Sequence, residues 1–139
     1  MKKFLIFITA GFLLLAVYRF LYQTDNPVFI GENISELDIP SGANVIRFER
    51  ESNEFNGDGY ILIALSVKQK GLNELQEQCF RQGYRKFDTN VFERQPALLS
   101  FYKRNDVGFY KVIAETADTF SISLLNSRKK TLVIYSINH

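Results

Sequence analysis

The beginning of the chain constrains its architecture most, because residues 4–22 contain a single charge, Arg19. As a helix this stretch would be about 28 Å long, close to the ~30 Å hydrocarbon core of a membrane. Lys2 and Lys3 precede it, whereas residues 23–40 carry four acidic and no basic side chains. This charge bias predicts that the N-terminus lies in the cytoplasm and that everything after the apolar run is exported.

We therefore expect three parts: a membrane anchor at residues 1–22 formed by a transmembrane helix, a tether at residues 23–43, and an exported α+β domain at residues 44–139. The alternative is a cleaved signal peptide, which also begins with basic residues and an apolar run. Cleavage requires small residues one and three positions before the cut, and the bulky Tyr18 and Tyr22 occupy such positions. The signal-anchor is the favoured interpretation. It places the protein in the inner or plasma membrane, with its C-terminal domain periplasmic or extracellular.

The exported part starts with two runs that have the pattern of β-strands. Residues 45–50 alternate apolar and charged side chains, as in a strand with one buried face. Residues 60–67 are almost entirely apolar, which is typical of a strand covered on both faces. Residues 56–59 have the sequence Asn-Gly-Asp-Gly, which favours a tight hairpin with positive φ. We expect the two strands to pair antiparallel.

The pattern of the remaining residues predicts one helix followed by further strands. Residues 71–83 have the period of an amphipathic helix. Its apolar face contains Leu72, Leu75, Cys79 and Phe80. Apolar or alternating runs predict strands at residues 98–103, 109–115 and 120–124 and from residue 132 onward. The expected fold class is α+β, an N-terminal transmembrane helix followed by a mostly antiparallel sheet (β-β-α-β-β-β-β) with one helix packed on a face.

The composition argues against several classes of function. Of the 17 lysines and arginines, three precede residue 23, so the remaining 14 face 15 acidic residues and no basic surface for nucleic acid is expected. Cys79 and His139 are the one cysteine and the one histidine of the chain. Together they cannot form a zinc site, and a histidine at the chain end is poorly placed for a catalytic triad. We expect no enzyme, no metal and no cofactor.

Asp58, between two glycines, is the sharpest local candidate for a binding residue. One interpretation is a hairpin turn, in which Gly and Asp are present for backbone reasons; this is the favoured one. The other is a carboxylate displayed to a partner. Glu49, Glu51 and Glu54 would then join it in an acidic rim, although cross-strand charge pairing explains these residues equally well.

Residues 48–87 combine a strand with acidic residues, a Gly-Asp-Gly turn at 57–59, an apolar strand, a helix rich in Leu, Glu and Gln, and the pair Gly-Tyr at 83–84. This stretch, from Phe48 to Phe87, resembles small membrane-anchored or lipoprotein-like bacterial proteins of uncharacterised function. Some proteins of this style are immunity-type partners of secreted toxins. The resemblance implies a non-enzymatic protein and identifies no ligand.

These observations together favour a membrane-anchored extracytoplasmic protein that binds another macromolecule, with an immunity-type protein as one form. The membrane is contacted through residues 4–22, and the other partner is expected to be a protein. The alternative is a structural or accessory subunit of a cell-envelope complex. An enzyme is a third hypothesis, which a pocket lined by convergent polar groups would favour.

The charge bias makes a direct prediction about topology. A phosphatase reporter that folds only outside the cytoplasm, fused after His139, is expected to be active, because the basic residues near the apolar run precede it. Enzyme assays on intact cells measure this. Activity from a cytoplasm-dependent reporter at the same position would contradict the orientation.

Overall fold

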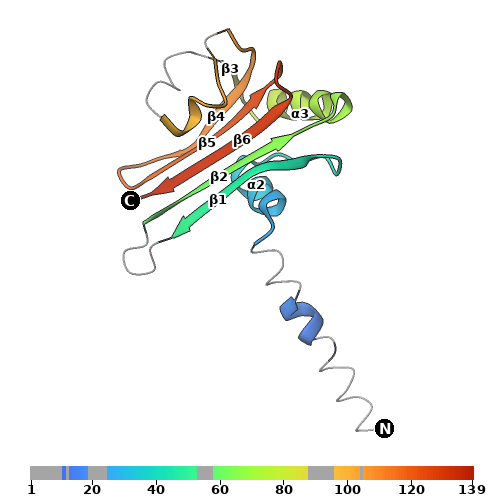
Figure 1. Ribbon diagram of the computed structural model, residues 1–139, viewed down its shortest axis with the longest axis vertical. Coiled ribbons are helices and arrows are strands. Elements are labelled where there is room, and N and C mark those ends of the chain that lie inside the picture. Colours follow the sequence, from blue (N-terminus) through green and yellow to red (C-terminus); the bar gives the residue numbers. More distant parts are fainter. Residues whose placement is uncertain (1–10, 12, 19–24, 53–57, 88–95, 104) are drawn as a thin grey trace.

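The computed structural model shows a six-stranded antiparallel sheet with helices on one face (Figure 1). The structure describes residues 11, 13–18, 25–52, 58–87, 96–103 and 105–139. The strands are β1 (Asn44–Ser52), β2 (Gly59–Ser66), β3 (Arg85–Lys86), β4 (Gly108–Glu115), β5 (Thr119–Asn126) and β6 (Thr131–Asn138).

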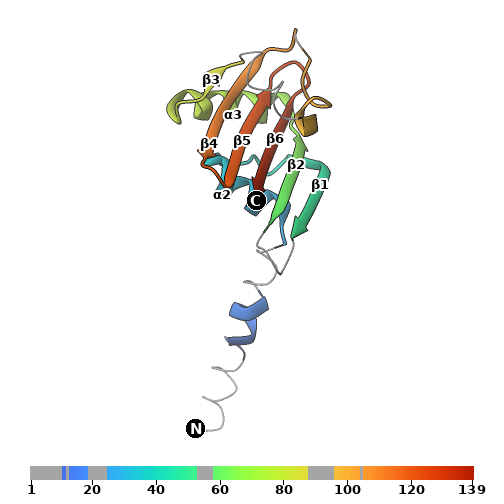
Figure 2. The ribbon, with the colours of Figure 1, turned by 90° about the vertical axis from the view of Figure 1, so that its left-hand side faces the viewer.

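The strand order in space is β1-β2-β6-β5-β4-β3, so the last strand of the chain lies in the middle of the sheet (Figure 2). β2 pairs with β6 over eight residue pairs, from Gly59 opposite Asn138 to Ser66 opposite Thr131. β1 is attached to β2 as a hairpin, and β4, β5 and β6 form a meander. The β2–β6 pairing therefore joins the two halves of the domain, and β1 becomes an edge strand.

Two helices, α2 (Pro27–Ser35) and α3 (Gln69–Arg81), cover one face of the sheet (Figure 1). Asn26 caps α2 by accepting a hydrogen bond from the backbone N–H of Val28 at 3.0 Å, and Pro27 occupies the first turn, where its missing N–H costs nothing. After α3 the chain reverses at Gly83, whose φ of +75° is the left-handed conformation that glycine tolerates.

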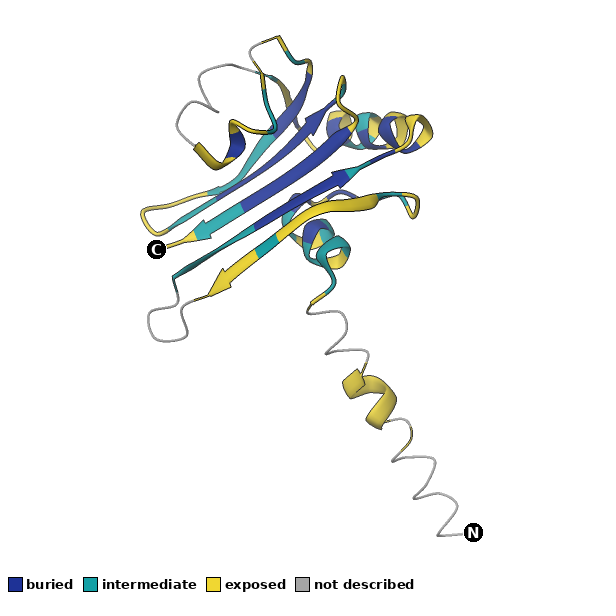
Figure 3. Ribbon diagram, in the orientation of Figure 1, coloured by how far each residue is buried: buried dark blue, intermediate teal, exposed yellow. Residues whose placement is uncertain are grey.

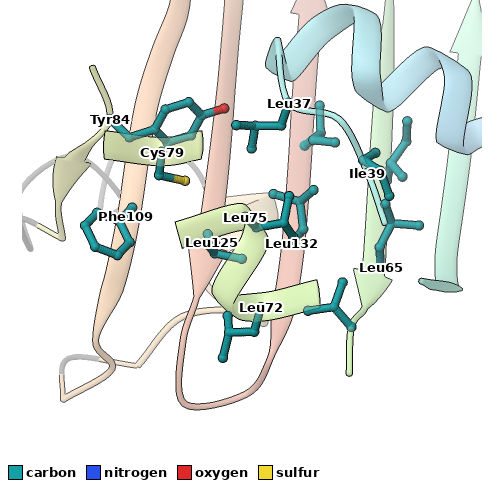
Figure 4. Close-up of a cluster of buried hydrophobic side chains, with 13 residues drawn as sticks. Leu37, Ile39, Leu65, Leu72, Leu75, Cys79, Tyr84, Phe109, Leu125 and Leu132 are labelled. Atoms are coloured by element: carbon teal, nitrogen blue, oxygen red, sulfur yellow. The ribbon is translucent and has the colours of Figure 1, made fainter. Parts of the chain in front are cut away.

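The core beneath the helices is shown in Figure 4. Leu72, Leu75 and Cys79 project from α3 toward the sheet, and all three are buried. Leu37 and Ile39, from the segment between α2 and β1, pack into the same cluster. The strands of the sheet contribute Ile63, Leu65, Phe109, Leu125, Leu132 and Ile134. Residues 27–39 thus belong to the folded core, although they lie in the stretch expected to be a tether.

The opposite face carries a second apolar cluster, so the central strands are buried on both sides (Figure 3). Leu98, at the end of the 3-10 helix η1 (Pro96–Leu98), is fully buried there against the sheet. Leu62 of β2 and Tyr135 of β6 belong to the same cluster. The nearly continuous apolar sequence of the central strands follows from this double covering.

The predicted fold class is wrong in its helices. Among the residues that the structure describes, no helix is long and apolar enough to cross a membrane. Of the predicted anchor, residues 11 and 13–18 are described and helical. The rest of that segment lies outside the described residues. In the described part of the chain two helices, not one, cover the sheet, because Asn26 and Pro27 start a helix within the stretch expected to be a tether.

The third strand was also predicted in the wrong place. Leu98 at the end of η1, and Phe101 and Tyr102 after it, pack on the second face of the sheet, and residues 98–103 do not form a strand. The strand after α3 is instead β3, two residues that pair with Phe109 and Tyr110 of β4. An apolar run covering a sheet and an apolar run inside one have similar sequences, which explains the error.

Candidate functional site

The most exposed element of the sheet is its edge strand β1. Of its nine residues only Glu49 is partly buried and the others are exposed, whereas the neighbouring β2 is buried along its centre (Figure 3). Val45, Ile46 and Phe48 are 42%, 56% and 37% exposed. No strand among the described residues pairs with the outer side of β1. Its outward N–H and C=O groups are therefore able to pair with another chain.

The register between β1 and β2 decides which side chains share a face. Glu49 lies opposite Leu62 and Glu51 opposite Tyr60, and Leu62 and Tyr60 belong to the cluster on the face away from the helices. Two of the four predicted acidic residues are therefore brought together on that face. Phe48 precedes Glu49 and lies opposite Ile63, which belongs to the cluster beneath the helices, so its side chain projects to the helix side.

Charges on this face are paired along the strand. Arg47 Nε lies 2.6 Å from a carboxylate oxygen of Glu49, and the Tyr60 hydroxyl donates to the other at 3.4 Å. The hydrogen bond from Arg47 holds the pKa of Glu49 below its usual value. Burial raises the pKa of Tyr60, and the negative charges of Glu49 and Glu51 raise it further. Arg47 also lies over the Phe101 ring at 5.7 Å, a cation–π contact that helps to orient the guanidinium.

A shallow hollow of about 180 Å³ adjoins the far end of β1. Glu51, Asp58 and Tyr60 line it together with Asn138 near the C-terminus. The structure thus brings the predicted residues Glu51 and Asp58 to one place. Glu54, the fourth predicted acidic residue, lies outside the described residues. A hollow of this size is large enough for one side chain and smaller than small-molecule sites, which are typically ~300–1,000 Å³.

Gly59, which follows Asp58, was expected to be a glycine because the hairpin turn needs positive φ, but the structure gives a different reason. It is not among the described residues with positive φ. A Cβ atom at Gly59 would instead lie 2.4 Å from the backbone oxygen of Glu51 on the paired strand. The glycine therefore permits the close approach of β1 and β2 at the end of the hairpin. The predicted tight turn itself falls largely on residues 53–57, outside the described part of the chain.

Cys79 and His139 lie in different environments. Cys79 is fully buried in the core, as predicted, and burial raises the pKa of its thiol to about 12, so it stays protonated at neutral pH. His139 is exposed at the chain end, where its backbone N–H donates to the Asp118 carbonyl at 2.7 Å. Within the described residues, no three His, Cys, Asp or Glu side chains converge as metal ligands would.

Two features were missed from the sequence. The carboxylate of Asp106 is almost buried and accepts hydrogen bonds from Asn126 at 2.8 Å and from the Lys103 backbone at 2.9 Å, which fixes the segment before β4. A larger hollow, about 430 Å³, lies beside β4 where β3 ends. Lys111 at its rim pairs with Glu36 at 2.5 Å. Beyond Arg85 and Lys86, β4 has no strand partner on this side among the described residues, and no pattern in the sequence indicates so short a β3.

Comparison of the chain with models of known protein families, with curated proteins and with solved structures finds no match. The resemblance of residues 48–87 to small anchored proteins therefore stays a prediction.

The close approach at Gly59 predicts the effect of a substitution. Gly59→Ala is expected to lower the free energy of unfolding by about 1–3 kcal/mol, because a backbone oxygen cannot move aside as a flexible side chain does. The matched control is Gly42→Ala, since a Cβ there meets nothing within 4 Å and stability should be unchanged or slightly higher. Urea unfolding of the full chain, followed by circular dichroism, measures both. Equal stability of the two variants would refute the close approach.

Proposed function

We propose that the folded domain is a protein-binding module that binds its partner along β1. We further propose that apolar residues 4–22 attach the protein to a membrane, with the domain on the side away from the cytoplasm. The observation that carries the proposal is the exposure of β1, a nine-residue edge strand with three large apolar side chains in solvent. Edge strands of this length are normally covered, shortened or blunted, because their unpaired backbone groups attract other chains.

Strand addition suits the residues of β1. An extended partner segment would pair with its outward N–H and C=O groups, and alternate side chains would provide specificity. Phe48 contributes an apolar contact on the helix side, while Glu49 and Glu51 present negative charge on the other side. The hollow at Asp58 would accept one side chain of the partner at the end of the strand.

Other ligand classes are less well supported by the same surface. After the first 22 residues, the acidic side chains exceed the lysines and arginines by one, so the domain lacks the excess of positive charge that phosphate backbones require. The hollow beside β1 is small and open, whereas small-molecule sites are typically 300–1,000 Å³ and enclose most of the ligand. A protein strand is the ligand that fits a long, exposed edge.

Membrane attachment is supported by the sequence of residues 4–22 and by the exposure of its described part. Leu13, Leu14 and Leu15 are 66–71% exposed, which is unfavourable in water and favourable in lipid. An immunity-type protein, with a secreted toxin as its partner, is one form of this proposal. Such a role would place the binding domain on the side of the membrane from which the toxin arrives.

The proposal predicts that a charge at the centre of the apolar edge removes the partner. Ile46→Lys is expected to reduce the native mass of the complex extracted in mild detergent to that of the single chain, because burying an unpaired ammonium at the interface is costly. Native gels or light scattering of the full chain measure this. Ile46 is 56% exposed, so the substitution should leave folding intact.

Val107→Lys is the matched control, because Val107 is a similarly exposed apolar residue, at 63%, that precedes β4 and lies away from β1. It should leave the complex unchanged. If the unmodified chain already has the mass of a single copy, or if both variants lose the partner equally, β1 is not the binding edge.

A further inference from the structure

The charges of β1 are arranged symmetrically about Phe48, with Arg47 on one side and Glu49 on the other. Two copies of an edge strand can pair antiparallel about a two-fold axis perpendicular to the sheet. In such a pair, residues directly opposite each other lie on the same face. The axis must then pass between one residue and the same residue of the second copy. The residue that precedes it in one copy lies opposite the residue that follows it in the other.

The possible axes differ in the charges that they bring together. An axis at Arg47 places two guanidinium groups opposite each other, and an axis at Glu49 does the same with two carboxylates. An axis at Phe48 places Phe48 against the partner's Phe48 on the helix side. It also places Arg47 opposite the partner's Glu49, twice by symmetry. Like charges directly opposite are destabilising and opposite charges are stabilising, so the Phe48 axis is preferred.

We propose that β1 pairs with β1 of a second copy of this chain about an axis at Phe48, so that one sheet continues across both copies. This inference rests on the proposed function, because it names the partner that occupies the same edge. Phe48, Val45 and Ile46 are exposed in the single chain and would lie at or beside this seam. Arg47 and Glu49 already contact each other within one chain at 2.6 Å, so both side chains lie ready on the face where the partner's charges arrive.

The irregular register between Val45 and Arg47 sets the strength of this pairing. A bulge there interrupts the regular ladder with β2 and bends the beginning of the strand. About the Phe48 axis, regular pairing then spans Arg47, Phe48 and Glu49, because Arg50 would meet Ile46 in the bulge. A short ladder with two exposed charge pairs gives a weak dimer, whose population depends on concentration. Attachment to a membrane would favour the dimer by confining the copies to a surface.

A cysteine at the axis tests the register directly. In antiparallel pairs, opposite Cα atoms lie ~4.5–5.5 Å apart, within the range that a disulfide spans. Phe48→Cys is therefore expected to form a disulfide-linked species of twice the chain mass on mild oxidation of the full chain in membranes. The native Cys79 does not interfere, because it is fully buried. Non-reducing gels and mass spectrometry measure the product.

Ser52→Cys is the matched control, since Ser52 is an exposed residue of the same strand. About an axis at Phe48, it would lie ~27 Å from the partner's Ser52, too far for a disulfide. The linked fraction of Phe48→Cys should exceed that of Ser52→Cys about tenfold. Equal linkage of the two variants would indicate random collision and overturn the register.

Charge reversal tests the same axis independently. Glu49→Arg places like charges opposite each other twice and is expected to weaken the dimer about tenfold. The double variant Arg47→Glu, Glu49→Arg restores opposite pairs and should restore the unmodified mass. Failure of the double variant to recover would contradict the Phe48 axis. Linkage of Phe48→Cys to a different protein would overturn the second-copy inference while supporting β1 as the binding edge; no linkage to any chain would contradict both.

Discussion

The pairing of β2 with β6 is the interaction on which the rest of the structure depends. It joins residues 59–66 to residues 131–138, so a hairpin formed early in the chain is fixed to a meander formed at its end. Both faces of these two strands are covered, so the apolar side chains on either side of the pairing are buried. Leu62 and Val133 on one face, and Ile63 on the other, are at most 2% exposed.

This central pairing also determines which strand is left at the edge. β2 has two neighbours, and once β6 takes one side, β1 must take the other and ends the sheet. The helices do not compensate, because α3 packs over the middle of the sheet and β1 stays exposed from Asn44 to Ser52. This apolar, mixed-charge edge is the surface to which the proposed partner would bind, and the order of the strands leaves it exposed. Fold and proposed binding therefore have the same physical origin.

The sequence predicted much of the sheet because strand periodicity is local. The hairpin of β1 and β2, the helix near residues 71–83, and three C-terminal strands lie where their patterns indicated. The strand order was not predictable, since the β2–β6 contact depends on packing between distant segments. α2 was missed because Asn26-Pro27 is compatible with both a turn and a helix start. Glu51 and Asp58 could be predicted to lie together because both flank the hairpin turn. That β1 beside them is an exposed edge could be known only from the strand order.

Amide hydrogen exchange of β1 as a function of protein concentration tests the central claim most directly. If β1 pairs with a second copy, residues 44–52 should be protected at high concentration and lose that protection on dilution. Residues 131–138, which are paired within one chain, should stay protected throughout. Exchange in residues 44–52 that is fast and independent of concentration would show that the edge has no partner of its own kind.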